Sequence, residues 1–96
     1  MATSKEYKDF VLDQLSLLDD ITFRPMMGEY LLYYKGKLFG GIYDERLLIK
    51  RTNSNKKYNL EESIPYKGAK PIYLIDTDNK ELIKEIVTKT YGDLYM

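Results

Sequence analysis

The sequence contains neither cysteine nor histidine. Without these residues the chain cannot form a disulfide framework, a thiolate or imidazole zinc site, a cysteine nucleophile or a Ser-His-Asp triad. These absences exclude most of the chemistry that small enzymes use. We therefore expect a protein that is not an enzyme, with no catalytic residue, no metal site and no bound cofactor.

Long apolar runs are also missing. No part of the chain approaches the run of about 18 apolar residues that suggests a membrane-spanning helix. The N-terminus lacks the apolar segment of a signal peptide. We therefore expect a cytoplasmic protein with no membrane partner.

The chain has no net charge, because 15 basic residues balance 15 acidic residues. This balance argues against a nucleic-acid binder whose whole surface is basic. The charges are unevenly distributed, however. Residues 46–70 contain seven basic and two acidic side chains, a formal charge of +5, which leaves −5 for the rest of the chain. A local contact with nucleic acid therefore stays open for this segment.

The length and composition indicate one folded domain spanning residues 1–96. A chain of 96 residues fits a single hydrophobic core. Apolar residues make up 44% and charged residues 31% of the sequence, which is ordinary for a globular protein. We expect the chain to fold on its own.

The N-terminal segment has the pattern of an amphipathic helix over roughly residues 4–18. Thr3 and Glu6 form a capping box at its start. The apolar residues that follow recur at helical spacing: Tyr7, Phe10, Val11, Leu15 and Leu18. A short strand is expected next over residues 21–24, ending or bulging near Pro25, because proline cannot donate to a central ladder.

The clearest pattern in the chain is a tight antiparallel meander. Residues 30–34 and 37–43 are rich in strand-forming residues and flank the turn pair Lys35-Gly36, which predicts a β-hairpin. A third strand is predicted over residues 46–50, because the intervening turn is too short for a crossover.

The remaining segments predict a loop, a strand and a helix. Residues 52–57 are polar and turn-forming, and residues 58–64 are expected to be irregular or a short helical turn. Residues 72–75 have the pattern of another strand. A second capping box, Asp78 with Glu81, begins a closing helix that Gly92 is expected to terminate.

This order of elements predicts a two-layer α+β domain, in which the N-terminal and C-terminal helices cover one face of an antiparallel sheet with a central β-meander. Strict alternation would place Phe39, Gly41 and Tyr43 on one face of their strand, with Leu38 and Ile42 on the other. Neither face is clearly polar. A second apolar layer, such as a partner subunit in a homodimer, could therefore cover the face that the helices leave open.

The segment from Arg24 to Tyr30 has the pattern R-x-M-x-G-x-Y, and a glycine-bearing strand follows it over residues 38–44. In these features, in its capped N-terminal helix and in its late strand and helix, the chain resembles the TfoX (Sxy) N-terminal domain family of bacterial proteins. The resemblance covers nearly the whole chain and implies a stand-alone domain with a secretion-chaperone-like α+β architecture. Longer members are linked to the regulation of natural competence for DNA uptake. The resemblance brings no catalytic or cofactor residue.

The candidate partner surface consists of residues in the meander: Arg24, Met27, Glu29, Phe39 and Tyr43. Arg24 could form a structural salt bridge with Glu29 or hold an anionic ligand through its guanidinium group. Met27 could belong to an adaptable partner surface or fill a gap in the core. Both interpretations stay open for each residue.

The candidate nucleic-acid contacts are the cations of one loop: Lys50, Arg51, Lys56 and Lys57. Such a loop could neutralise phosphates, or it could simply be solvated. The ten tyrosines could stack on bases, although strands and helical core faces account for many of them.

Two hypotheses about function follow. The first is a non-enzymatic binding or regulatory module that acts by protein–protein contact, through a sheet face or an exposed strand edge, and that could form a homodimer. The alternative is a nucleic-acid-associated regulator of transcription or competence that uses the basic segment 46–70.

Overall fold

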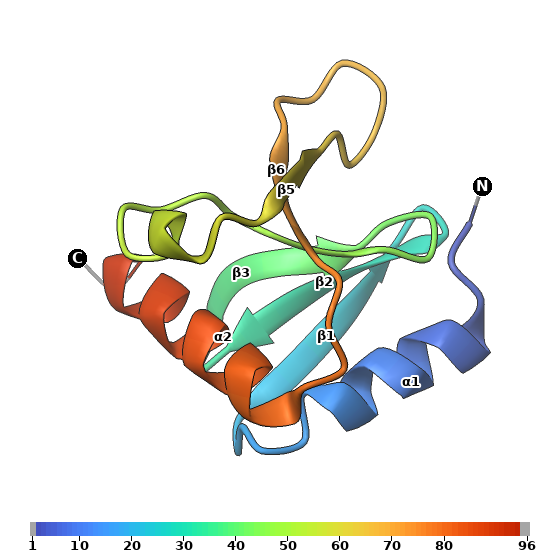
Figure 1. Ribbon diagram of the computed structural model, residues 1–96. Helices are drawn as coiled ribbons and strands as arrows, with labels where there is room; N and C mark the ends of the chain where they lie inside the picture. The colour runs from blue at the N-terminus through green and yellow to red at the C-terminus, as the bar shows by residue number, and fades with distance from the viewer. Residues whose placement is uncertain (1, 95–96) are drawn as a thin grey trace.

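The computed structural model describes residues 2–94, which form two α-helices and a six-stranded antiparallel sheet (Figure 1). The helices are α1 (Lys5–Gln14) and α2 (Lys80–Leu94), and a short 3₁₀ helix, η1 (Lys56–Tyr58), lies between them in the sequence. The strands are β1 (Ile21–Met26), β2 (Glu29–Tyr34), β3 (Lys37–Ile42), β4 (Leu47–Ile49), β5 (Glu61–Ser63) and β6 (Ile72–Ile75). Their order across the sheet is β1-β2-β3-β4-β6-β5. The prediction of an α+β fold with N-terminal and C-terminal helices is confirmed.

Strands β1 to β4 form the predicted meander through three tight turns. The turn residues Lys35 and Gly36 have φ angles of 51° and 80°. Asp44 and Glu45, between β3 and β4, have φ angles of 50° and 56°. Positive φ at both central residues is the geometry that matches the twist of two paired strands. The short connections therefore fix each strand beside its predecessor.

Both helices lie on the same face of the sheet (Figure 1), which we call the inner face. The hydrophobic core lies between the helices and the sheet. It consists of completely or almost completely buried side chains: Val11, Leu15, Leu32, Phe39, Ile42, Leu47, Ile49, Ile75, Ile83, Ile86 and Val87. Burial of each large aliphatic side chain contributes about 1.5 to 3 kcal/mol relative to exposure. This core positions the sheet and leaves its opposite side, the outer face, without a helix.

A β-bulge in β3 overturns the predicted alternation of side chains. Leu32 pairs with Gly40 and Tyr33 pairs with Leu38, so Phe39 is the extra residue on β3. The bulge brings Phe39 to the inner face together with Ile42, and both are completely buried. The expectation that Phe39 and Tyr43 share one face is therefore wrong.

Gly40, the residue after the bulge, has no room for a side chain beside β4. A Cβ atom at this position would lie 2.2 Å from the carbonyl oxygen of Leu48 and 2.9 Å from the Cα atom of Ile49. Both obstacles are backbone atoms of β4, which a change of side-chain rotamer cannot relieve. Glycine therefore allows β3 and β4 to approach each other.

The predicted start and end of the first helix need correction. Ser4, rather than Thr3, is its N-cap, because the Ser4 hydroxyl accepts a hydrogen bond from the Tyr7 backbone N–H. The helix ends at Gln14, and residues 15–18 continue as a turn that still places Leu15 and Leu18 in the core. Phe10 is not on the core face as predicted: it is 51% exposed.

The closing helix also differs at both ends. The Asn79 side chain accepts a hydrogen bond from the Leu82 N–H, so Asn79 caps α2 where Asp78 was predicted. Gly92 lies inside α2, which continues to Leu94. Glycine lowers helix propensity by about 1 kcal/mol relative to alanine, and here the packing of α2 against the sheet outweighs that cost.

The sequence prediction missed β5 altogether. Its residues Glu61, Glu62 and Ser63 have no strand pattern, and two of them are exposed carboxylates. They pair with Leu74, Tyr73 and Ile72 of β6. Strand β5 therefore exists because β6 provides a backbone ladder, and not because its own residues favour a strand.

Candidate functional site

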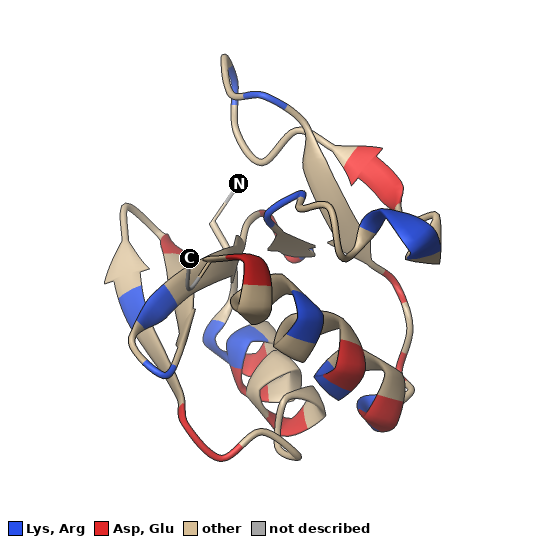
Figure 2. Cartoon of the chain, turned by 90° about the vertical axis from the view of Figure 1, so that its left-hand side faces the viewer, with Lys and Arg blue, Asp and Glu red and all other residues tan. Residues whose placement is uncertain are grey.

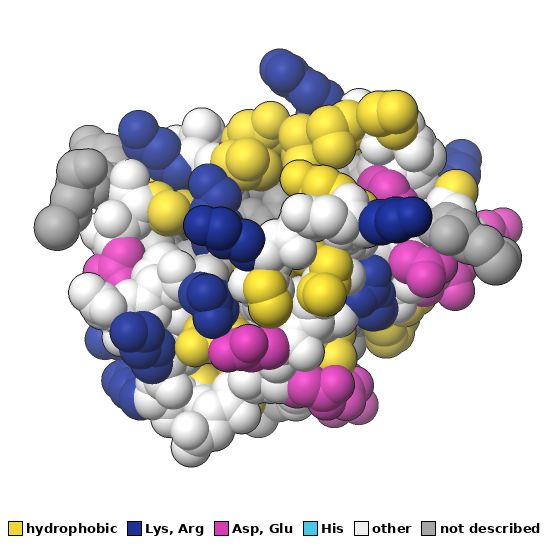
Figure 3. Space-filling view, turned by 90° about the horizontal axis from the view of Figure 1, so that it is seen from above, with side chains coloured by type: hydrophobic (Ala, Val, Ile, Leu, Met, Phe, Trp, Pro, Cys, Tyr) yellow, Lys and Arg dark blue, Asp and Glu magenta, His cyan; other side chains and the backbone are white. Residues whose placement is uncertain are grey.

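The outer face of the sheet is apolar, although no helix covers it. Cross-strand partners share a face, so the register places Arg24, Leu31 and Leu48 together on this side, and likewise Tyr33 with Leu38. Leu31, Tyr33 and Leu38 are half-buried. A view from this side shows hydrophobic side chains gathered in patches with basic side chains among them (Figure 3). The outer face therefore has the character of a contact surface.

One end of the outer face is covered by the connection between β5 and β6, residues 64–71, which we call the arm. The arm projects from the body of the domain (Figure 1). Leu48 is completely buried and Tyr43 is 8% exposed on this side of the sheet. On the arm itself, Ile64 and Tyr66 are 52% and 59% exposed.

Arg46 attaches the arm to the sheet. Its Nε donates to the carbonyl oxygen of Tyr43 at 3.1 Å, and its two terminal nitrogens donate to the Ser63 hydroxyl and to the carbonyl oxygens of Ile64 and Pro65. The planar guanidinium group can make all of these bonds at once, which a lysine cannot do. One of the seven cations in segment 46–70 is therefore part of the internal structure.

A small pocket of about 210 Å³ lies between the arm and the outer face. Tyr43 and Tyr66 line it, with ring centroids 6.0 Å apart, and Lys50 and Lys70 line it as well. Burial raises the pKa of the Tyr43 hydroxyl, and the neighbouring Tyr66 and Glu29 raise it further. Tyr43 therefore stays protonated at neutral pH, as a neutral wall of this pocket.

Both edges of the sheet are protected against pairing with another strand. At one edge Pro25 lies in β1, and its residue partner across the two-residue hairpin is Tyr30. Hydrogen-bonded pairs alternate from the turn, so this proline falls at a position where its nitrogen points away from β2 and removes a donor from the open edge. At the other edge, β5 is short and carries Glu61 and Glu62. These are typical ways of preventing edge-to-edge pairing.

The structure separates the five residues of the predicted partner surface. Met27 is 96% exposed at the tip of the β1–β2 turn, and Arg24 is exposed with its guanidinium 5.9 Å from the centre of the Tyr33 ring. Phe39 is completely buried, so its assignment to a partner surface is wrong. Tyr43 reaches the surface only slightly, beside the arm.

Glu29 has a structural role that the sequence did not reveal. Its Oε1 accepts hydrogen bonds from the N–H and hydroxyl of Thr3 and from the N–H of Asp44. The Thr3 hydroxyl in turn accepts from the N–H of Glu45. These bonds join the N-terminus and two turns of the meander. In the register Arg24 faces Leu31 rather than Glu29, so the pairing of Arg24 with Glu29 is not observed.

The four cations of the basic loop point to different neighbours. Lys50 lines the pocket beneath the arm, and Arg51 forms an ion pair of 3.2 Å with Glu62. The Lys57 ammonium lies 5.4 Å from the centre of the Tyr58 ring, whereas Lys56 lines a separate pocket. The loop therefore does not present one continuous basic surface.

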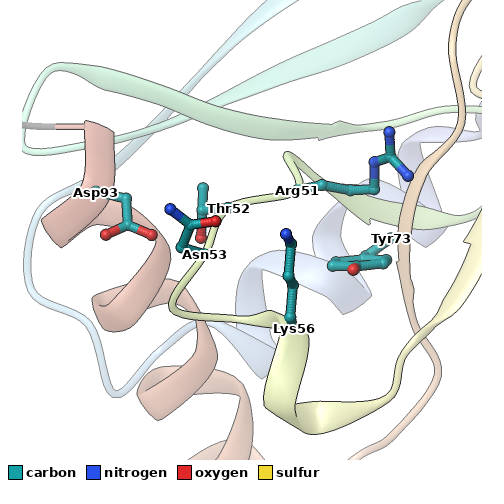
Figure 4. A pocket seen from close by; sticks show the side chains of 6 residues that line it. All are labelled: Arg51, Thr52, Asn53, Lys56, Tyr73 and Asp93. Atoms are coloured by element: carbon teal, nitrogen blue, oxygen red, sulfur yellow. The ribbon is translucent and has the colours of Figure 1, made fainter.

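This separate pocket, which we call the loop pocket, has a volume of about 560 Å³ (Figure 4). It is lined by Arg51, Thr52, Asn53, Lys56, Tyr73 and Asp93. Figure 4 shows the Lys56 side chain rising from η1 into the space between the 51–53 backbone and the Tyr73 ring, with Asp93 at the opposite end of the pocket from Arg51.

Asn55 holds the wall of the loop pocket in place. Its side chain is completely buried and accepts a 2.9 Å hydrogen bond from the Thr52 N–H. It donates to the Lys50 carbonyl oxygen and to the Thr90 hydroxyl of α2, each at 2.9 Å. A buried amide that is bonded on both ends fixes the loop relative to the helix. The sequence showed only a polar loop at this position, with no signal for a buried residue.

Asp93 makes a second connection between α2 and the loop. Its two carboxylate oxygens accept from the N–H and the hydroxyl of Ser54 at 2.8 and 2.9 Å. The Ser54 N–H is the main cause of a lowered pKa for this carboxyl, and the hydroxyls of Thr52 and Ser54 add to it. The Thr52 hydroxyl is buried and does not reach hydrogen-bond geometry with any described residue.

The fold and these surfaces define a small two-layer α+β domain with one sheet face open. Within residues 2–94 no group of three or more carboxylates could hold a metal ion, and no helix is long and apolar enough to cross a bilayer. The profile of the TfoX N-terminal domain matches residues 13–90. The chain belongs to this family, which confirms the resemblance.

The chain is also similar to a curated protein of Spirochaeta aurantia, named "Uncharacterized 12.7 kDa protein in trpE 5'region". The two are 37% identical over 78 residues, which cover 79% of this chain and 68% of the relative. The name of the relative gives no activity. The match supports the family assignment and leaves the function to be argued from the surfaces.

Proposed function

We propose that this chain is a non-enzymatic binding or regulatory module that acts by contact with another protein through the outer face of its sheet. The observation that carries the proposal is the half-buried apolar surface of Leu31, Tyr33 and Leu38, which no helix covers and of which only Leu38 lines the pocket beneath the arm. Contiguous apolar surface on a soluble domain is a feature of protein interaction sites.

The opposite side of the domain supports this choice of surface. The solvent side of α2 carries alternating basic and acidic residues (Figure 2), among them Lys80, Glu81, Lys84 and Glu85. Mixed charges of this kind are typical of a helix surface that stays in water. The two sheet edges are protected by Pro25 and by the carboxylates of β5, so the face is better suited to a partner than either edge.

The regulatory part of the proposal rests on the family. Its longer members are linked to competence regulation, and the domain that this chain represents has no cysteine or histidine with which to perform common enzymatic chemistry. A role in regulating a partner protein by binding to it, without a chemical reaction, is consistent with both observations.

Site-specific photo-crosslinking tests the proposal. Benzoylphenylalanine in place of Tyr66 on the arm should give a discrete adduct in the native cytoplasm, and Leu38→Glu should abolish it by placing a charge on the outer face. The matched control replaces Lys84 on α2 and should give no adduct. Equal adducts from both positions, or none from the arm, would contradict the proposal.

A homodimer is one version of this proposal, and light scattering distinguishes it. A second copy of the chain predicts a concentration-dependent doubling of mass that Leu38→Glu removes. A chain that stays monomeric but still yields the adduct requires a different protein as the partner. Folding of the variant is checked by its melting temperature.

The alternative is a nucleic-acid-associated regulator that uses the basic loop. The observation that favours it is the placement of cations next to aromatic rings: Lys57 beside Tyr58, and Lys56 beside Tyr73. Such pairs can contact phosphates while bases stack on the rings. Fluorescence anisotropy of a labelled oligonucleotide should show binding at low salt that weakens steeply with added salt. No binding at low salt, or binding unchanged in the Lys56→Glu/Lys57→Glu double variant, would exclude this alternative.

A further inference from the structure

The loop pocket differs from the outer face in being polar, pre-organised and supplied with unused donors. Among residues 2–94 the Lys56 ammonium has no hydrogen bond or ion pair, although the side chain extends into the pocket (Figure 4). The neighbouring Thr52 hydroxyl is buried without a hydrogen bond of normal geometry, but it lies close enough to Asp93 to lower the pKa of that carboxyl. The free donor of this pocket is therefore the Lys56 ammonium, which an anionic group would satisfy.

We propose that the loop pocket binds the phosphoryl group of a small ligand, with Lys56 and Arg51 as its donors. A phosphoryl group offers several acceptor oxygens, which matches a point cation and a forked cation that line one pocket. Glu62 fixes Arg51 by accepting from one terminal nitrogen at 3.2 Å, which leaves its other donors for a ligand.

The rest of the pocket suits the remainder of such a ligand. Its volume of about 560 Å³ exceeds what a phosphoryl group alone requires and lies in the usual range for small-molecule sites. The Tyr73 ring lies beside Lys56 in Figure 4 and can pack against a planar or apolar group. Pre-organisation by Asn55 and α2 lowers the ordering cost that binding would otherwise carry.

Asp93 restricts the position of the anion. Its carboxylate would repel a phosphoryl group nearby, but it lies at the end of the pocket opposite Arg51 and already accepts two bonds from Ser54. The phosphoryl group therefore belongs at the Lys56 end. The free lone pairs of Asp93 could accept from a hydroxyl or amino group at the other end of the ligand.

Titrations followed by amide NMR spectra at constant ionic strength test the proposal, with inorganic phosphate and adenosine monophosphate as probes. We expect saturable shifts of the Thr52, Asn53 and Lys56 amides with both probes. Tyr73→Leu should weaken the nucleotide more than phosphate, because only the nucleotide has a ring to pack against Tyr73. The absence of saturable shifts with either probe would overturn the proposal.

Matched variants separate a built site from general charge attraction. Lys56→Gln should raise the dissociation constant for phosphate by about tenfold, equivalent to about 1.4 kcal/mol, whereas Lys57→Gln removes the same charge one residue away and should leave it nearly unchanged. Equal weakening by Lys56→Gln and Lys57→Gln would reduce the effect to nonspecific attraction and overturn the site.

A third probe distinguishes the source of the phosphoryl group. A single-stranded oligonucleotide offers the same phosphate chemistry as part of a polymer. If the oligonucleotide binds and both small probes fail, the pocket proposal is wrong and the nucleic-acid alternative gains support. Either result is independent of the outer-face crosslinking, since the Lys84 and Tyr66 positions do not line this pocket.

Discussion

The two faces of the sheet are built from similar residue types but are covered in different ways. On β4, Leu48 and Ile49 point to opposite faces and both are completely buried. On β2, Leu32 is completely buried on the inner face, whereas Leu31 on the outer face is half-buried. The inner face is thus closed over β3 and β4, although Phe23 on the edge strand β1 is 40% exposed, and the outer face is closed only beneath the arm.

The two coverings also depend on different interactions. The helices are held on the inner face by close apolar packing, with Val87 and Ile83 among the completely buried residues. The arm is held by the hydrogen bonds of Arg46 and by the contact between the Tyr66 and Tyr43 rings. Packing is disturbed by any change of volume, whereas a few polar contacts can be lost without opening the core. The contacts that hold the arm on the outer face could therefore be lost without unfolding the domain.

The largest loss of stability is expected from a substitution at Gly40, where the backbones of β3 and β4 approach each other. Gly40→Ala would place a Cβ atom 2.2 Å from the Leu48 carbonyl oxygen, so β3 and β4 would have to separate. We expect a loss of more than about 3 kcal/mol in the free energy of unfolding, measured by urea denaturation. Gly92→Ala is the control, because nothing lies within 4 Å of its Cβ position in α2. It should raise stability by roughly 0.5 to 1 kcal/mol. A stable Gly40→Ala protein would disprove the close approach.

The next prediction tests the two faces directly with adjacent leucines. Leu32→Ala should cost about 2 to 5 kcal/mol of unfolding free energy, because it leaves a cavity in the closed core. Leu31→Ala removes the same atoms from the open face, and its cost should be below about 1 kcal/mol. Equal costs for the two variants would show that the outer face is buried as deeply as the inner face.

Sequence patterns were sufficient for the meander but not for the assignment of its faces. The turn pair Lys35-Gly36 and the strand-forming residues around it have a local signature, so the hairpin could be predicted. The bulge at Phe39 lies in the pairing of β2 with β3, and a period of two cannot reveal an inserted residue. As the extra residue of β3, Phe39 lies in the core and not on the surface that the sequence pattern predicted.

The polar connections were predicted least well. Both capping boxes were placed one residue too early, because Thr3 and Ser4, or Asp78 and Asn79, are equally good N-caps by residue type. The bonds of Asn55 and Arg46 join segments that are far apart in the sequence. For the loop cations, proximity in the sequence could not show that Arg51 pairs with Glu62 while Lys57 faces Tyr58.

A smaller effect is expected from loosening the outer covering. Arg46→Ala removes the bonds to the arm, and we expect a loss of about 1 to 3 kcal/mol, with faster amide exchange in residues 63–69 and little change in the core. Arg46→Lys should restore little, since an ammonium group cannot span the same acceptors. Arg51→Ala, which loses a half-exposed ion pair, should cost less than about 1 kcal/mol. Uniformly faster exchange in α2 would show that the arm and the inner layer open together.

The smallest effect is expected for the pH dependence of the hydrogen bonds that join α2 to the loop through Asp93 and Ser54. The Ser54 N–H lowers the pKa of Asp93 in the folded state below its ordinary value of 3.8. The ionised carboxylate therefore stabilises the fold fully above that value, and this contribution is lost as the pH falls through the lower, folded-state pKa. Asp93→Asn should reduce stability at neutral pH and flatten the decline of the melting temperature in acid. Asp19→Asn, in an exposed loop, should leave that decline unchanged. If Asp93→Asn retains the full acid decline, other carboxylates govern it, and the join does not hold the polar loop to the helix that closes the inner face.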